Sequence, residues 1–201
     1  DCIDPADIVE ATGVLFTTRR GEKSLQVQSW RPLTKALLPL PEKWHGLQDI
    51  ETRYRARELD LLSNEEVRQR FLVRSKLVAA LRRFFDDRGF IEVETPMLHP
   101  IPGGANARPF VTHHNALDAD FYLRIAPELY LKRLLVGGFE RVYEIGRSFR
   151  NEGIDHTHNP EFTMLELYWS FVKREPFIAF LEEMVSTIVS AAMGSTEVVT
   201  P

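Results

Sequence analysis

The chain has 201 residues, 44% of them hydrophobic and 27% charged, which is enough to bury a core in one and a half to two domains. Its formal net charge of −4 excludes the overall basic character of a nucleic-acid binder, so any RNA contact must depend on local patches. No uninterrupted apolar run approaches the roughly 20 residues of a membrane span, no secretory signal opens the sequence, and the single cysteine, Cys2, excludes an internal disulfide.

The first 30 residues predict β structure. An apolar run at 13–18 is followed by a charged turn at 19–23, and Leu25 and Val27 then alternate with glutamines. Two strands cannot bury a core by themselves, so we expect them to be the end of a small β domain. The sequence starts with Asp1 rather than with methionine, and we expect a piece of a longer chain.

Residues 31–62 are predicted to be a linker. Prolines interrupt any long helix there, and charged residues are dense from 51 to 60. Arg53, Arg55 and Arg57 have the chemistry to meet phosphates. The neighbouring acids favour a solvated surface instead.

A long helix is predicted to begin at Ser63, because Glu66 three residues later completes a capping box. Gly89 is expected to end it. A strand follows at 90–95 and stops at Pro96, which cannot donate to a ladder. The apolar residues at helical spacing, which we expect to face the interior, are Val67, Phe71, Val78, Leu81 and Phe85.

The middle and the end of the chain predict a glycine loop and two more helices. The loop is at 102–105, where glycine permits an unusual backbone angle or a close approach by a ligand. A helix is predicted at 128–136, with Glu128 in its first turn. That acid stabilises the helix dipole, and a ligand role is preferred only if it points into the same pocket as Glu166. The last helix is predicted from Pro176 to Gly194, with a core-packing face formed by Phe177, Leu181, Met184 and Ile188.

Two strands that face each other across a polar connection are the centre of the sequence. The first is predicted at 143–149 and the second at 162–168, both with the period of two that is typical of half-buried strands. One face of the second strand mixes an acid, a phenol and a phenyl ring, which suits the wall of a pocket for a small polar ligand. That face is formed by Phe162, Met164, Glu166 and Tyr168.

These motifs resemble the class II aminoacyl-tRNA synthetases over essentially the whole chain. Residues 88–96 are similar to the first motif of that class, a helix, a strand and a proline at the dimer interface. Residues 149–162 are similar to its second motif. Aspartyl and asparaginyl enzymes share parts of this pattern, but the full set resembles the lysyl-tRNA synthetase family. The stretches that carry this distinction are 101–104, 124–130 and 158–163.

The resemblance implies an α+β fold, with an antiparallel sheet flanked by helices and preceded by partial OB-type strands. Residues 1–30 are then the C-terminal part of an OB-fold anticodon-binding domain, 31–62 a linker, and 63–201 the N-terminal part of the catalytic domain. The third motif of the class and the acids that bind Mg²⁺ are expected beyond Pro201. No metal ligand is therefore assigned within the chain, and we expect the 201 residues alone to be incompletely active.

For function, the resemblance implies a lysine–tRNA ligase that forms lysyl-adenylate from lysine and ATP and then transfers the lysyl group to tRNA. The enzyme's work is positioning and charge neutralisation. Arg150 is the implied catalytic residue, because its fork can hold an α-phosphate oxygen and the attacking carboxylate together. The residues implied to contact ATP are Arg150, Asn151, Glu152, His158, Asn159 and Phe162. The residues implied to hold lysine are Gly104, Glu128, Glu166 and Tyr168.

Two acids for two ammonium groups explain the choice of lysine. Glu128 is expected to meet the α-amino group and Glu166 the ε-amino group, and a neutral side chain would leave Glu166 unpaired. If the two carboxylates lay on opposite sides of the sheet, the lysine assignment would fail.

The resemblance implies the partners lysine, ATP with Mg²⁺, and tRNA(Lys), and a homodimer formed through the first-motif region in the cytoplasm, with no membrane or DNA partner. Three alternatives stay open: a related aspartyl or asparaginyl ligase, a paralogue that modifies a protein, and a non-catalytic binding module. Glu166 argues for a cationic substrate against the first. The OB-like strands argue against the second.

Overall fold

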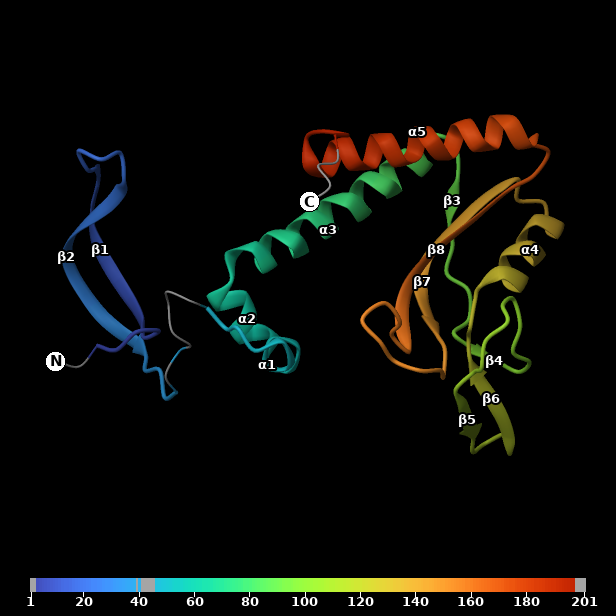
Figure 1. Cartoon of the computed structure of the whole chain (residues 1–201), viewed down its shortest axis with the longest axis horizontal. Coiled ribbons are helices and arrows are strands. Elements are labelled where there is room, and N and C mark those ends of the chain that lie inside the picture. Colours follow the sequence, from blue (N-terminus) through green and yellow to red (C-terminus); the bar gives the residue numbers. More distant parts are fainter. Residues whose placement is uncertain (1–2, 39, 41–45, 198–201) are drawn as a thin grey trace. The chain divides into compact units, whose positions relative to one another are not determined.

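The computed structural model describes residues 3–38, 40 and 46–197, and the chain divides into two compact units, Asp1–Leu72 and Val73–Pro201. Cys2 lies outside the described residues. Helices and mostly antiparallel strand pairs make up both units (Figure 1), which confirms the predicted α+β class.

The first unit begins with a long hairpin, which confirms the two predicted strands. β1 (Ile8–Thr17) pairs antiparallel with β2 (Lys23–Thr34), and both strands extend beyond the predicted ranges. Gly13 lies at an irregularity of the register, where an added Cβ would stand 2.0 Å from the carbonyl oxygen of Gln26. A residue with a side chain cannot occupy that position without moving β2.

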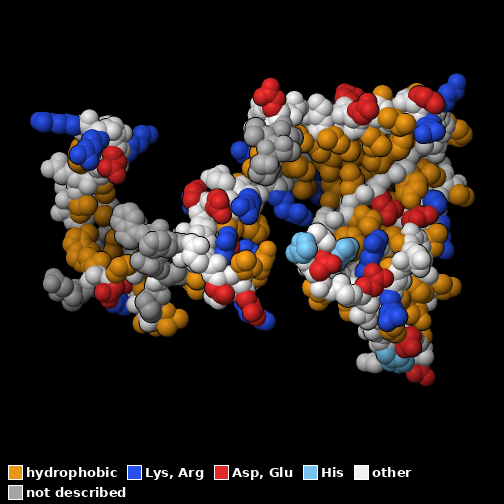
Figure 2. All heavy atoms as spheres, in the orientation of Figure 1, with side chains coloured by type: hydrophobic (Ala, Val, Ile, Leu, Met, Phe, Trp, Pro, Cys, Tyr) orange, Lys and Arg blue, Asp and Glu red, His pale blue; other side chains and the backbone are white. Residues whose placement is uncertain are grey.

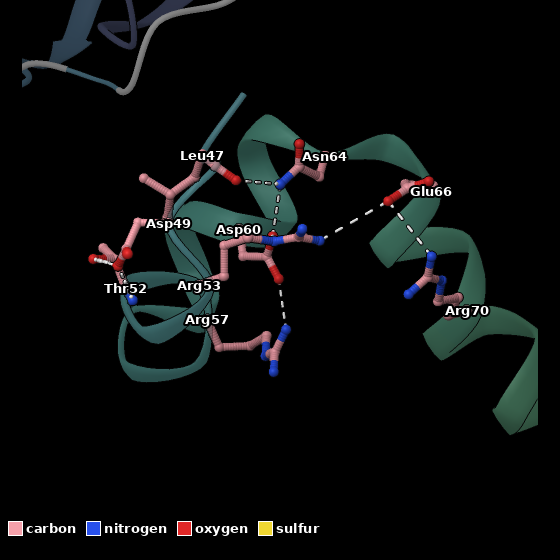
Figure 3. A network of polar contacts seen from close by, with 9 residues as sticks. All are labelled: Leu47, Asp49, Thr52, Arg53, Arg57, Asp60, Asn64, Glu66 and Arg70. Atoms are coloured by element: carbon pink, nitrogen blue, oxygen red, sulfur yellow. Dashed lines mark hydrogen bonds and ion pairs between the residues drawn. The ribbon is translucent and has the colours of Figure 1, made fainter. Parts of the chain in front are cut away.

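The predicted linker contains two short helices, α1 (Ile50–Arg55) and α2 (Arg57–Ser63). Figure 3 shows why they form: the fully buried carboxylate of Asp60 accepts hydrogen bonds from Arg53 Nε at 2.8 Å and Arg57 Nη1 at 2.5 Å. The prediction of a solvated surface is therefore wrong for these two arginines. It is confirmed for Arg55, whose side chain is 78% exposed beside Glu51.

The long helix α3 (Glu65–Asp86) begins two residues later than predicted. Ser63 is the last residue of α2 instead of an N-cap, and Glu66 lies 3.5 Å from Arg70, so the predicted capping box is wrong. The end is confirmed, because Gly89 has a φ of +72°. Of the predicted apolar face, Val67, Leu81 and Phe85 are buried, whereas Phe71 is 50% exposed, with the guanidinium of Arg57 5.9 Å from its ring.

Two small sheets form the framework of the second unit. In the first sheet, β7 (Arg141–Phe149) pairs antiparallel with β8 (Glu161–Trp169), and β3 (Ile91–Glu92) joins β7 at the edge as a parallel strand. The predicted strand at 90–95 is thus only two residues long. The second sheet has the order β4-β6-β5, with β4 (Leu98–His99), β5 (Val111–His114) and β6 (Ala119–Leu123).

Aromatic rings from α3, β7 and the last helix, α5 (Arg174–Met193), fill the core of the second unit. Phe85 is fully buried and stacks on Tyr143, with ring centroids 4.5 Å apart, and Phe180 lies 5.3 Å from Phe90. The predicted packing face of α5 is confirmed, and Gly194 closes the helix with a φ of +79°.

By length and composition α5 also qualifies as a helix that can cross a membrane, with a mean hydropathy of 1.4. Glu182 and Glu183 lie between its apolar residues, so no continuous apolar run marks this helix in the sequence. Figure 2 shows hydrophobic side chains gathered along this helix, and Ile178 and Val185 are exposed. Its other face packs into the core described above.

Candidate functional site

The β7–β8 pair separates the core from the candidate site. Cross-strand partners share a face of a sheet, and Glu144 lies directly opposite Glu166 in the register. The other face carries Tyr143 and Leu167, which belong to or pack against the aromatic core. The predicted alternation of β8 between two faces is therefore confirmed, with Leu165 and Leu167 against the core, and the pocket on the other face stays a prediction.

Helix α4 (Glu128–Val136) brings a second acid to the pocket face, and its bounds are those predicted. It contacts both β7 and β8, and its residue Leu131 is fully buried. Glu128 is the first residue of α4, with 31% of its side chain exposed, and it forms an ion pair with Lys132 one turn later. The Glu128 carboxylate thus already holds an ammonium group.

The two acids lie on the same side of the sheet. Burial raises the pKa of Glu166 above its ordinary value, the hydroxyl of Tyr168 lowers it, and the charge of Glu128 raises it further. Burial followed by the charges of Glu166 and Glu128 raises the pKa of Tyr168. The Tyr168 hydroxyl donates to Glu166 at 3.4 Å. The structure therefore places Tyr168 in contact with Glu166 and brings Glu128 close enough for its charge to act on both.

Gly104 lies against the first turn of α4. Its φ is +88°, and an added Cβ would stand 3.1 Å from Cβ of Glu128 and 3.2 Å from Cβ of Ala126. The loop requires a glycine here for its backbone angle and for its close approach. Gly104 therefore lies beside Glu128, and its predicted role in holding lysine stays a prediction.

A buried ion pair on this same face, between Arg124 and Glu144, was not assigned a role from the sequence. Arg124, 1% exposed, donates from Nη1 to Oε1 of Glu144 at 2.5 Å. The hydroxyl of Thr95 accepts from Arg124 Nη1 at 3.0 Å and donates to Glu144 Oε2 at 2.7 Å. The cross-strand register was the signal that could have found Glu144, because it pairs with Glu166.

Arg150 directly follows β7 and lies beside a separate cavity. Its Nε atom is buried without a hydrogen-bond partner, and its guanidinium lies 5.0 Å from the ring of Phe162. A buried donor without a partner is costly, and a ligand oxygen would satisfy it. The cavity has a volume of about 260 Å³ and is lined by Arg150, Glu152, Gly153, Thr157, His158, Asn159 and Phe162.

The loop between β7 and β8 closes on itself through Asp155. Hydrogen bonds lower the pKa of Asp155 well below its usual range. The largest contribution comes from the backbone N–H of Thr157, followed by the Thr157 hydroxyl and His158. His158 Nδ1 lies 2.8 Å from Asp155 Oδ2, and the His158 side chain is 73% exposed. Asn151 is exposed, does not line the cavity, and donates its backbone N–H to Arg108. The cavity thus gathers every predicted ATP-binding residue except Asn151.

Within the described residues, no group of three or more His, Cys, Asp or Glu side chains is arranged to hold a metal ion. His113 contacts Asp120 at 3.1 Å in the β5–β6 hairpin. The Mg²⁺ expected to accompany ATP therefore stays a prediction.

Comparison with known proteins assigns the chain to a family. The family profile described as tRNA synthetases class II (D, K and N) matches residues 49–200. The chain is 62% identical over 178 residues to a lysine–tRNA ligase of Wolinella succinogenes. The aligned residues cover 89% of the chain and 35% of that protein.

Two further relatives give the same result. Identity is 57% over 196 residues to a lysine–tRNA ligase of Carboxydothermus hydrogenoformans, covering 98% of the chain and 40% of that protein. It is 60% over 195 residues to the heat-inducible lysine–tRNA ligase of Escherichia coli K12, covering 97% of the chain and 39% of that protein. The chain thus spans about two fifths of the length of the curated relatives it matches. It belongs to the class II tRNA synthetases of the D, K and N group.

Proposed function

We propose that the protein containing this chain is a lysine–tRNA ligase, and that the chain supplies its amino-acid pocket and part of its ATP site. The observation that carries the proposal is the convergence of Glu128 and Glu166 on one face of the β7–β8 pair, with Arg150 at the end of β7. The printed names of the relatives agree with it.

The acids select the amino acid by charge. Glu166 is partly buried, so its ionised form is unfavourable until a cation reaches it, and the ε-ammonium of lysine is such a cation. Tyr168 adds a hydroxyl beside that carboxylate. The α-ammonium group of lysine displaces the Lys132 side chain from its ion pair with Glu128. A neutral side chain leaves Glu166 without a partner, which costs more than a lost apolar contact.

The ATP side of the reaction rests on Arg150 and Phe162. The unpartnered Nε of Arg150 is available to an oxygen of the α-phosphate or of the lysine carboxylate. The ring of Phe162 offers a stacking surface for adenine beside it. With both substrates held, the lysine carboxylate attacks the α-phosphorus, the bond to the β-phosphate oxygen breaks, and pyrophosphate leaves with that electron pair. The lysyl group then passes to a ribose hydroxyl of tRNA(Lys), and AMP leaves.

The proposal includes Mg²⁺ with ATP, a cytoplasmic location and a homodimer formed through residues 88–96. Support for the dimer comes from apolar side chains at the edge of the first sheet and just after it: Ile91 is 46% exposed, and Met97 and Leu98 are each 45% exposed.

ATP–pyrophosphate exchange by the complete protein, with lysine, aspartate, asparagine and norleucine in turn, tests the function. We expect exchange with lysine, and exchange slower by at least roughly 100-fold with each of the other three amino acids. Aspartate would bring a second negative charge to Glu166, and the neutral side chains of asparagine and norleucine would leave Glu166 unpaired. Exchange that depends on aspartate or asparagine would assign the protein to another branch of the family.

A matched pair of variants ties the exchange to this site. Glu166→Gln should lower kcat/KM for lysine by about 100-fold or more, since loss of one partner of a buried ionic contact costs about 3 kcal/mol or more. Glu175→Gln, which removes an exposed acid of α5, should leave it unchanged. Equal activity of the two variants would remove Glu166 from the lysine pocket.

A further inference from the structure

Arg124 and Glu144 lie on the pocket face itself, beside Glu166. Both are at least 95% buried, and the ion pair between them is reinforced by Thr95, which contacts both side chains. A buried ion pair is not in itself a good source of stability, because desolvation offsets its attraction. Its position next to Glu166 gives it a different role.

The backbone around Arg124 fits closely to the guanidinium. Nε donates to the carbonyl oxygen of Arg147 at 2.7 Å, and Nη1 also contacts the Thr95 carbonyl at 3.2 Å. An added Cβ at Gly146 would stand 2.1 Å from Nη2 of Arg124 and 3.0 Å from Oε1 of Glu144. The guanidinium therefore occupies the space that any other residue at position 146 would fill.

The pair also acts on Glu166 directly. Glu144 is its cross-strand partner, and the charges of both Glu144 and Arg124 reach the Glu166 carboxylate with opposite effects on its pKa. Like charges directly opposite on a sheet destabilise each other, so Glu144 without a counter-ion would oppose ionisation of Glu166. Arg124 supplies that counter-ion.

We propose that Arg124 and Glu144 are positioning residues that determine specificity by fixing the charge of the pocket floor. Arg124, Glu144 and Glu166 together carry one positive and two negative charges, so the floor has one unbalanced negative charge for one ε-ammonium. This rests on the proposed lysine activation. The further step is that Glu166, the acid touching the substrate, selects lysine only while the ion pair beside it is neutral overall.

Glu144→Gln in the complete protein is the first test. It keeps the shape of the side chain but frees the charge of Arg124 to neutralise Glu166. We expect KM for lysine to rise about 30-fold or more, kcat and KM for ATP to stay within roughly 3-fold, and discrimination between lysine and norleucine to fall about 10-fold or more.

The double variant Arg124→Met/Glu144→Gln separates charge from structure. It removes both charges and restores one net negative charge to the floor, so KM for lysine should return to within roughly 5-fold of the wild type. A double variant as impaired as Glu144→Gln, with the thermal stability of both close to wild type, would overturn the charge argument.

Thr95→Val decides the question if Glu144→Gln does not fold. It removes the hydroxyl that joins Arg124 to Glu144 and should raise KM for lysine roughly 3- to 10-fold without changing KM for ATP, and Thr95→Ser should restore it. An unchanged KM in Thr95→Val, or equal rises for lysine and ATP, would refute the proposal. Wild-type protein without lysine-dependent exchange would refute the proposed function instead, because every variant is compared with an active wild type.

Discussion

At the scale of single residues, the proposed lysine site depends on an acid whose ionised form is disfavoured by its surroundings. Burial is the largest effect on Glu166, and the nearby Glu128 and Glu144 add to it. A raised carboxyl pKa means that the folded protein binds the proton more tightly than the unfolded chain does. Ionisation of Glu166 therefore opposes folding above its ordinary pKa of 4.5, and the cationic substrate relieves that cost on binding.

A pH dependence follows from this. Only ionised Glu166 attracts the ε-ammonium, so kcat/KM for lysine should fall as the pH falls through the raised pKa of Glu166, with its midpoint above 4.5. Tyr168 lowers that pKa through its hydroxyl, so Tyr168→Phe should move the midpoint to higher pH. The measurement is pyrophosphate exchange at subsaturating lysine from pH 5 upwards, with KM for ATP as the control. A midpoint that does not move in Tyr168→Phe would show that another group titrates.

The sequence pattern indicated a role for the acids Glu128 and Glu166, but not for the ion pair of Arg124 and Glu144 that lies beside Glu166. Glu166 and Tyr168 stood out because an acid and a phenol sit on one face of an otherwise apolar strand. Glu144 lies in a strand of ordinary alternation, Arg124 directly follows β6, and nothing in the sequence shows that the two side chains touch. Their contact arises because Arg124, just after β6, meets β7 in the folded chain, which local periodicity cannot reveal.

At the scale of elements, long periodic segments were predictable and short ones were not. The bounds of α4 and the pairing of β7 with β8 follow from the sequence pattern. The helices α1 and α2 have six and seven residues, too few to show a helical period, and they depend on the buried Asp60. The same reasoning explains the misplaced start of α3, because α2 uses Ser63 as its own last residue.

The aromatic cluster that supports β7 gives an element-scale prediction. Phe85 is fully buried and stacks on Tyr143, so Phe85→Ala should destabilise the fold by about 3–5 kcal/mol through lost burial and the cavity left behind. Phe171 is 96% exposed, and Phe171→Ala should change stability by less than about 0.5 kcal/mol. Urea unfolding of the complete protein measures both. A loss below about 1 kcal/mol in Phe85→Ala would contradict the packing described here.

At the scale of the whole molecule, the proposed site lies in one of the two compact units. The unit Val73–Pro201 contains both candidate subsites, and all of the residues proposed to hold lysine or ATP lie within it. The unit Asp1–Leu72 contains the hairpin that resembles an OB-fold end, together with α1 and α2. The boundary between the two units falls within the residue range of α3.

The proposed homodimer is a property of the whole molecule, and Ile91 tests it. β3 is an edge strand, and edge strands with exposed apolar side chains are suited to association. Covering a side chain of this size contributes about 1.5–3 kcal/mol, so Ile91→Asp should weaken the dimer by roughly 10- to 100-fold or more in dissociation constant. Sedimentation equilibrium of the complete protein measures this constant, with Val136→Asp as the control because Val136 is 90% exposed at the end of α4. If both substitutions left the constant unchanged, the contact surface would lie elsewhere; if both weakened it equally, added charge rather than the edge of the sheet would be responsible.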